Sequence, residues 1–111
     1  MSIHGRVVHR PGRMNKSESA YAQLLQARQQ AGEVLMWLFE PAKLNLTDTG
    51  WLCTYTPDFL VVTAEGLVEF HEVKGHWEDD ARVKIRVAAS RFPFRFVGVT
   101  RKKGVWFYEE F

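Results

Sequence analysis

The sequence contains very little cysteine, no long hydrophobic run and almost no excess of charge. Cys53 is the single cysteine among 111 residues, so no intramolecular disulfide can form, which suits a reducing cytoplasm. It lies in an apolar run and is expected to be a core or half-buried residue rather than a nucleophile. No stretch has the roughly twenty apolar residues of a membrane span. The basic N-terminus lacks the apolar run of a signal peptide. We therefore expect a cytoplasmic protein with no membrane partner.

The composition is that of a folded domain with an uneven distribution of charge. Hydrophobic residues make up 46% of the chain and aromatic residues 14%, which is enough for a core in one domain. The net charge is only +2, but no acidic residue precedes Glu18. The cations of this first part of the chain are Arg6, Arg10, Arg13 and Lys16. Such cations suit contacts with phosphates, although a solvated, disordered arm would have the same composition. We expect a basic arm over residues 1–14 and a single domain over 15–111.

Local patterns predict an α/β (α+β) domain with a mixed central sheet flanked by helices. Helices are expected over about 17–31 and 79–91, the first with Asn15 and Glu18 as a capping box. Gly32 is a natural helix stop. Strands are expected over 34–39, 43–46, 51–55, 58–63, 67–74, 94–99 and 105–108, with a turn over 101–104. This order of helices and strands predicts the mixed sheet.

Asp58, Glu72 and Lys74 are the candidate catalytic residues. Glu72 and Lys74 are two positions apart on a predicted strand, so they share a face, and hairpin pairing brings Asp58 alongside Glu72. Two carboxylates, with the backbone carbonyl of Val73, can bind Mg²⁺ or Mn²⁺, which supports phosphodiester hydrolysis. Lys74 can position the attacking water and stabilise developing charge, or act as a base if its pKa is depressed. An ordinary Glu–Lys pair on an exposed sheet face is the alternative.

The residues around this triad resemble a known superfamily. The runs Tyr55–Val62 and Glu69–Gly75 resemble the PD-(D/E)XK nucleases, and the layout of about residues 16–99 is similar to small phage-encoded members and to Holliday-junction resolvases. The resemblance implies a restriction-endonuclease-like α-β-β-β-α-β core. It also implies metal binding by Asp58 and Glu72 and a catalytic role for Lys74. In many members an acidic residue of the first helix joins the site. Glu18 is at that position, where a capping role and a metal contact both stay open.

Several further residues are candidates for contact with DNA, each beside a simpler interpretation. His76 follows Gly75 at the mouth of the expected site and can contact DNA or belong to a structural loop. Lys84 on the second helix can follow phosphates or merely solvate the helix. Lys102 and Lys103 can clamp phosphates from a hairpin tip. His71 is expected to face away from the site as a structural residue. The C-terminal aromatic residues are expected in the core or on a dimer surface: Trp106, Phe107 and Tyr108.

Together these features predict a divalent-metal-dependent endodeoxyribonuclease, phage-encoded and acting in a bacterial host cell during DNA replication, recombination or packaging. No motif reads bases and the chain has little room for a specificity domain, so we expect cutting of branched DNA such as Holliday junctions. Symmetric cutting of a junction would require two sites, as in a C2 homodimer. A non-catalytic DNA-binding or assembly subunit is one alternative. A nuclease subunit targeted by a phage recombination or replication partner is the other.

Overall fold

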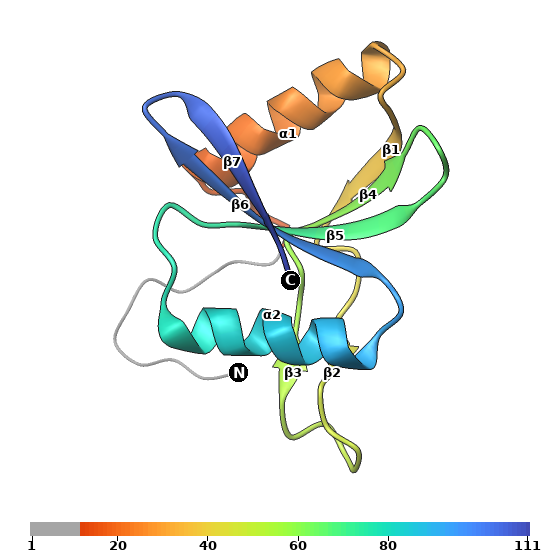
Figure 1. Cartoon of the computed structure of the whole chain (residues 1–111), viewed down its shortest axis with the longest axis vertical. Helices are drawn as coiled ribbons and strands as arrows, with labels where there is room; N and C mark the ends of the chain where they lie inside the picture. The colour runs from red at the N-terminus through yellow and green to blue at the C-terminus, as the bar shows by residue number, and fades with distance from the viewer. Residues whose placement is uncertain (1–11) are drawn as a thin grey trace.

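The structure, a computed structural model, describes residues 12–111. These residues form two helices and seven strands (Figure 1). The helices are α1 (Lys16–Gln30) and α2 (Asp79–Arg91). The strands are β1 (Val34–Phe39), β2 (Leu44–Asn45), β3 (Thr54–Tyr55), β4 (Phe59–Thr63), β5 (Val68–Val73), β6 (Arg95–Lys102) and β7 (Val105–Glu110). Neither helix in this part of the chain is long and apolar enough to cross a membrane.

The main sheet has five strands in the order β1-β4-β5-β6-β7, and β2 and β3 form a separate small hairpin. The pair β5–β6 is parallel, and the other neighbouring strands are antiparallel. A parallel pair needs a long crossover, which α2 supplies between β5 and β6. The predicted α+β architecture with a mixed sheet is therefore confirmed.

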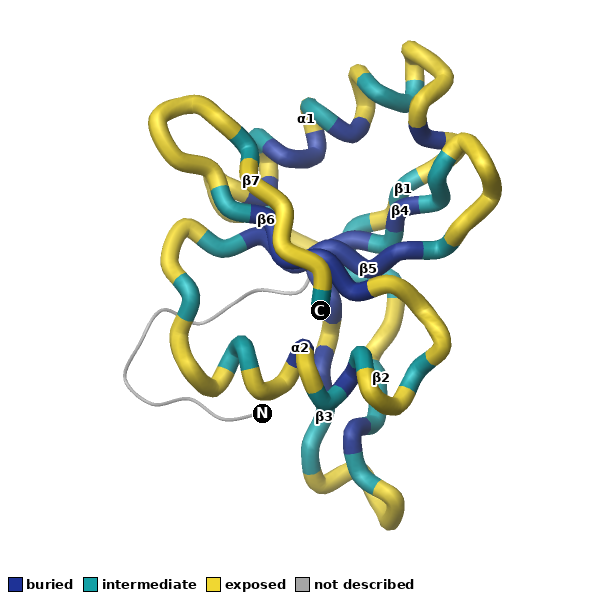
Figure 2. The backbone as a smooth tube through the Cα atoms, viewed as in Figure 1, coloured by how far each residue is buried: buried dark blue, intermediate teal, exposed yellow. Residues whose placement is uncertain are grey.

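The two helices cover opposite faces of the sheet (Figure 1). Tyr21 and Leu25 of α1 pack in one buried cluster with Val73 of β5, and Ile85 of α2 packs in another with Phe70. Successive residues of β5 thus face different helices, as strand alternation requires. The centre of the sheet is consequently buried on both faces (Figure 2). The alternative of an ordinary Glu–Lys pair on an exposed sheet face is wrong for Glu72.

The first helix begins and ends as its sequence predicts. The Asn15 side chain accepts a hydrogen bond from the Glu18 amide at 2.8 Å, and the Glu18 carboxylate accepts one from the Asn15 amide at 2.9 Å. This is the expected capping box. Gly32 follows the helix with a φ of 82°, which glycine adopts without a steric penalty. The secondary-structure prediction is therefore accurate here to within one residue.

The C-terminal hairpin differs from its prediction. Strand β6 extends to Lys102, so Arg101 and Lys102 belong to the strand, and the predicted turn over 101–104 is too long. The reversal takes only Lys103 and Gly104, whose φ angles of 51° and 77° suit a two-residue hairpin turn. The predicted core position holds only for Trp106, whose ring lies 5.1 Å from that of Tyr21. Phe107 and Tyr108 are exposed.

Candidate active site

Asp58 and Glu72 face each other across the β4–β5 hairpin. Phe59 of β4 pairs with His71 of β5 in antiparallel register. Asp58, which directly precedes β4, therefore lies opposite Glu72 of β5. The Asp58 amide donates to the Glu72 carboxylate at 3.2 Å, and the Val73 amide donates to the Asp58 carboxylate at 2.8 Å. Both side chains are buried, with 7% of each residue exposed. The juxtaposition expected from the sequence is thus present.

Two further side chains hold Glu72. The Tyr55 hydroxyl donates a hydrogen bond to Glu72 Oε1 at 2.8 Å, and Lys74 Nζ lies 3.3 Å from Oε2. Both oxygens of the carboxylate therefore have partners, which fixes its orientation. The sequence interpretation gave Tyr55 no role. The signal that could have identified it is its place in the run Tyr55–Asp58, three residues before the first carboxylate.

The first strand also contributes to the position of Asp58. The Glu40 amide donates to the Asp58 carbonyl oxygen at 2.7 Å, just after β1 ends. Glu40 has a φ of 48°, the left-handed region in which residues other than glycine are uncommon. The contact of Glu40 with Asp58 is thus made by its backbone. This bond fixes the main chain at the point where Asp58 enters β4.

Burial and mutual repulsion perturb the ionisation of the two carboxyl groups. Burial, followed by the charges of Glu72 and Glu18, raises the pKa of Asp58 to about 9, although the Val73 amide and Lys74 oppose this rise. Burial likewise raises the pKa of Glu72, against the opposing effect of Lys74. The site thus gathers more carboxyl groups than Lys74 can balance if all of them were ionised. Strongly perturbed carboxyl groups of this kind are typical of functional sites.

Lys74 is held in its charged form. Burial lowers its pKa, but the carboxylates of Glu72, Asp58 and Glu18 together raise it further than burial lowers it. The role as a general base required a depressed pKa, and the direction here is the opposite. The arrangement instead suits a fixed positive charge beside the two carboxylates, which can stabilise negative charge developing on a substrate.

The donor set at the site fits a magnesium ion held mainly by water and substrate. No group of three or more His, Cys, Asp or Glu side chains within residues 12–111 is arranged to hold a metal ion. Mg²⁺ commonly uses one or two carboxylates and retains several waters, so Asp58 and Glu72 suffice for such a site. Metal contacts by the Val73 carbonyl and by Glu18 stay predictions. One Glu18 oxygen already accepts the hydrogen bond of the capping box. The charge of the Glu18 carboxylate nevertheless raises the pKa of Asp58.

Glu72 and Lys74 open onto a pocket of about 350 Å³, called here the Glu72 pocket. The other residues that line it are Thr54, Tyr55, Thr56, Asp80, Ala81 and Lys84. Lys84 therefore lies at the candidate site, as its proposed contact with DNA requires, and its Nζ donates to the Thr54 carbonyl at 3.1 Å. Asp80 belongs to the first turn of α2, and nothing in the sequence indicated that it lies at this pocket. Asp58 does not line the pocket and lies buried behind Glu72.

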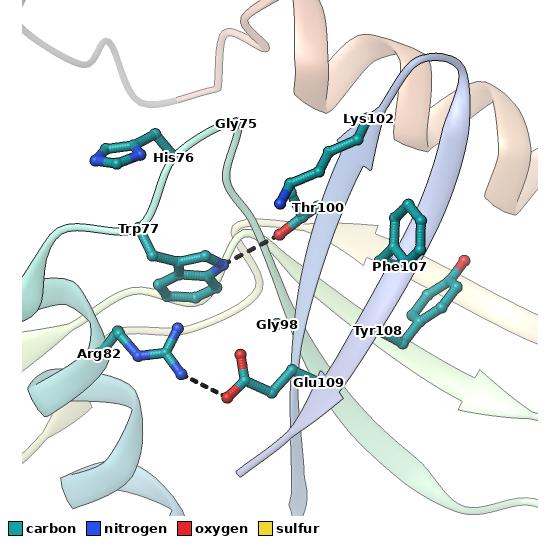
Figure 3. Close-up of a pocket in the computed structure, with 10 residues that line it drawn as sticks. All are labelled: Gly75, His76, Trp77, Arg82, Gly98, Thr100, Lys102, Phe107, Tyr108 and Glu109. Atoms are coloured by element: carbon teal, nitrogen blue, oxygen red, sulfur yellow. Dashed lines mark hydrogen bonds and ion pairs between the residues drawn. The ribbon is translucent and has the colours of Figure 1, made fainter.

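The remaining predicted DNA-binding residues lie elsewhere. His76 and Lys102 line a second pocket, and Lys103 lies at the β6–β7 turn (Figure 3). Lys16 is exposed at the start of α1, close in sequence to the exposed Arg13. The predicted residues Arg6 and Arg10 fall outside the described residues.

His71 and Cys53 are structural, as expected. His71 is buried between the Tyr21 hydroxyl at 2.6 Å and the Glu69 carboxylate at 2.9 Å. It faces α1 and so points away from Glu72, in agreement with the prediction from strand alternation. Cys53 is half-buried against the cluster that contains Leu46 and Tyr55. Neither residue lines the Glu72 pocket.

Comparison with known proteins identifies no relative. No protein-family model, no curated protein and no solved structure matches this chain.

Proposed function

We propose that this protein is a divalent-metal-dependent DNA endonuclease with a restriction-endonuclease-like core. The observation that carries the proposal is the buried pair Asp58 and Glu72, facing each other across one hairpin with Lys74 3.3 Å from Glu72. The element order α1-β1-β4-β5-α2-β6 supports the proposed core. The resemblance of the same residues to the PD-(D/E)XK pattern supports it independently of burial and charge.

Each residue of the site has a role in this proposal. Asp58 and Glu72 would hold Mg²⁺ or Mn²⁺, which when bound polarises the scissile phosphate and lowers the pKa of a bound water. The charged Lys74 stabilises negative charge on the phosphate and orients the attacking water. Tyr55 keeps Glu72 oriented through its hydrogen bond. Lys84, which also lines the Glu72 pocket, attracts the phosphate backbone.

DNA as substrate, selectivity for branched structures and a C2 homodimer belong to the same proposal. The cations around the site support an anionic polymer as ligand. Within residues 12–111 the two helices and seven strands include no separate module for reading bases. A non-catalytic subunit would not need two facing buried carboxylates, because uncompensated buried charge destabilises a fold. A nuclease targeted by a partner protein would keep the chemistry and would lack activity alone.

A cleavage assay tests the proposal. Wild type and the variants Lys74→Ala and Lys43→Ala are incubated with supercoiled, linear, flap and four-way-junction DNA in Mg²⁺, Mn²⁺ or EDTA. Lys43 is an exposed lysine that does not line the Glu72 pocket. We expect metal-dependent cleavage that falls at least about 100-fold in Lys74→Ala, as for loss of a transition-state donor. Lys43→Ala should cut like wild type. Unchanged activity in Lys74→Ala would overturn the mechanism. No cleavage of any DNA would favour a binding subunit or a nuclease that requires a partner protein.

A further inference from the structure

A second pocket, shown in Figure 3, has a volume of about 490 Å³. Its volume is in the range of pockets that bind small ligands. It lies between the loop after β5, the beginning of α2 and the β6–β7 hairpin, and is called here the Trp77 pocket. Its lining residues include Gly75, His76, Trp77, Arg82, Lys102 and Phe107.

One wall of the Trp77 pocket is a fixed aromatic ring. Trp77 Nε1 donates to Thr100 Oγ1 at 3.2 Å, and the ring packs on Gly98, where a Cβ atom would lie 2.7 Å from it. The guanidinium of Arg82 stacks 5.7 Å from the ring centre and pairs with Glu109. The Trp77 ring is thus held from two sides, as Figure 3 shows.

A second aromatic ring faces the same space without a packing role. Phe107 pairs with Thr100 in the β6–β7 register, so both side chains lie on the pocket face of the hairpin. The residue is 53% exposed and belongs to neither buried cluster. Lys102 lies on the same face, and among residues 12–111 it forms no ion pair. Two aromatic rings with an uncompensated cation are thus gathered in one pocket.

The Trp77 pocket and the Glu72 pocket share a boundary. Lys74 lines the Glu72 pocket, and the next residue, Gly75, lines the Trp77 pocket. On α2, Ala81 and Arg82 are divided between the two pockets in the same way. A strand whose phosphate lies at Lys74 can therefore continue directly into the Trp77 pocket.

We infer that the Trp77 pocket binds one unpaired nucleotide of the DNA strand that is cut. Its base stacks on the exposed ring of Phe107 in the pocket that Trp77 lines, while Lys102 and His76 contact the adjacent phosphate. Aromatic platforms beside cations are the general means of binding single-stranded nucleic acid, because every base has a stacking face. A base within a duplex is already stacked on its neighbours, so its faces are not free to stack on an aromatic side chain. This inference rests on the proposed function. It would explain physically why the proposed nuclease prefers branched DNA, which contains unpaired nucleotides.

Binding without cleavage tests the inference. Fluorescence anisotropy in EDTA measures the affinity of wild type and variants for a fluorescein-labelled oligothymidylate and for a duplex. We expect Phe107→Ala to weaken single-strand binding about tenfold, as for loss of one base stack, with duplex binding unchanged. Phe107→Trp should restore it. Leu35→Ala, which removes a side chain of similar exposure (55%) on β1, should bind like wild type.

The proposed phosphate contact of Lys102 is tested by the salt dependence of single-strand binding. We expect Lys102→Ala to weaken single-strand binding and to reduce the slope of log affinity against log salt by about one, as for loss of one phosphate contact. Lys43→Ala should leave the slope unchanged. Equal affinities of Phe107→Ala, Leu35→Ala and wild type, with folding verified by circular dichroism, would overturn the inference. Absence of cleavage with single-strand binding intact would instead reject the nuclease and leave the pocket assigned.

Discussion

Asparagine in place of Asp58 is expected to stabilise the metal-free protein. The pKa of this buried carboxyl is raised to about 9 by burial and by Glu72, against an ordinary value of 3.8. The folded protein thus keeps a proton at pH 7 that the unfolded chain releases. At about 1.4 kcal/mol for each pH unit between 3.8 and 7, this costs about 4 kcal/mol of stability.

The sign of the effect follows from the raised pKa. The loss of stability that Asp58 causes in wild type is absent below pH 3.8, grows as the pH rises towards 9 and is constant above pH 9. Asparagine does not ionise and retains an oxygen for the Val73 amide, but its own NH₂ group must find an acceptor. We therefore expect a net gain of about 2 kcal/mol at pH 7, or a melting temperature higher by about 10 °C.

Thermal unfolding followed by circular dichroism measures this gain in EDTA at pH 7 and at pH 4. Asp58→Asn should be more stable than wild type at pH 7 and less stable at pH 4, where the ionisation cost of Asp58 is nearly absent and only the cost of the asparagine NH₂ group remains. Glu65→Gln, an exposed carboxylate in the β4–β5 turn, should change little at either pH. A less stable Asp58→Asn protein at pH 7, or the same gain at both pH values, would refute the reasoning from buried charge.

Three other outcomes are expected from the same geometry. Mg²⁺ at ten times its dissociation constant should stabilise wild type by about 1.4 kcal/mol in thermal unfolding, and Asp58→Asn should not respond. Tyr55→Phe removes the 2.8 Å hydrogen bond to Glu72 and should cost about 1–3 kcal/mol of stability in urea titration, together with slower cleavage; equal stability would mean that the hydroxyl does not hold Glu72. Gly98→Ala places a Cβ 2.7 Å from the Trp77 ring and should cost about 1–3 kcal/mol. An unchanged urea midpoint for Gly98→Ala would contradict the packing described for Trp77.

Local patterns predicted much of the fold because short-range interactions determine it. Asn15 and Glu18 interact over three residues, so their spacing alone indicates the capping box. Strand alternation placed His71 on the face opposite Glu72, and hairpin pairing placed Asp58 beside Glu72. These relations depend only on the spacing of residues in the sequence and on the regular geometry of strands, so they can be predicted from the sequence.

Features that depend on distant parts of the chain could not be predicted. The place of Asp80 on the Glu72 pocket arises because α2 crosses beside β3. The raised pKa of Lys74 is a balance between burial and three carboxylates from different elements. The end of β6 depended on its pairing with β7, which continues to Lys102 opposite Val105. DNA, the metal ion and the homodimer stay predictions.

Glu18 ties the beginning of α1 to the chemistry of the site. Its carboxylate closes the capping box while its charge raises the pKa of Asp58 and of Lys74. A cation bound between Asp58 and Glu72 would therefore favour the ordered first turn of α1, and by thermodynamic reciprocity a well-formed first turn would favour the cation. Position 18 is consequently under two constraints at once, and an aspartate there would keep the charge but be too short to close the capping box.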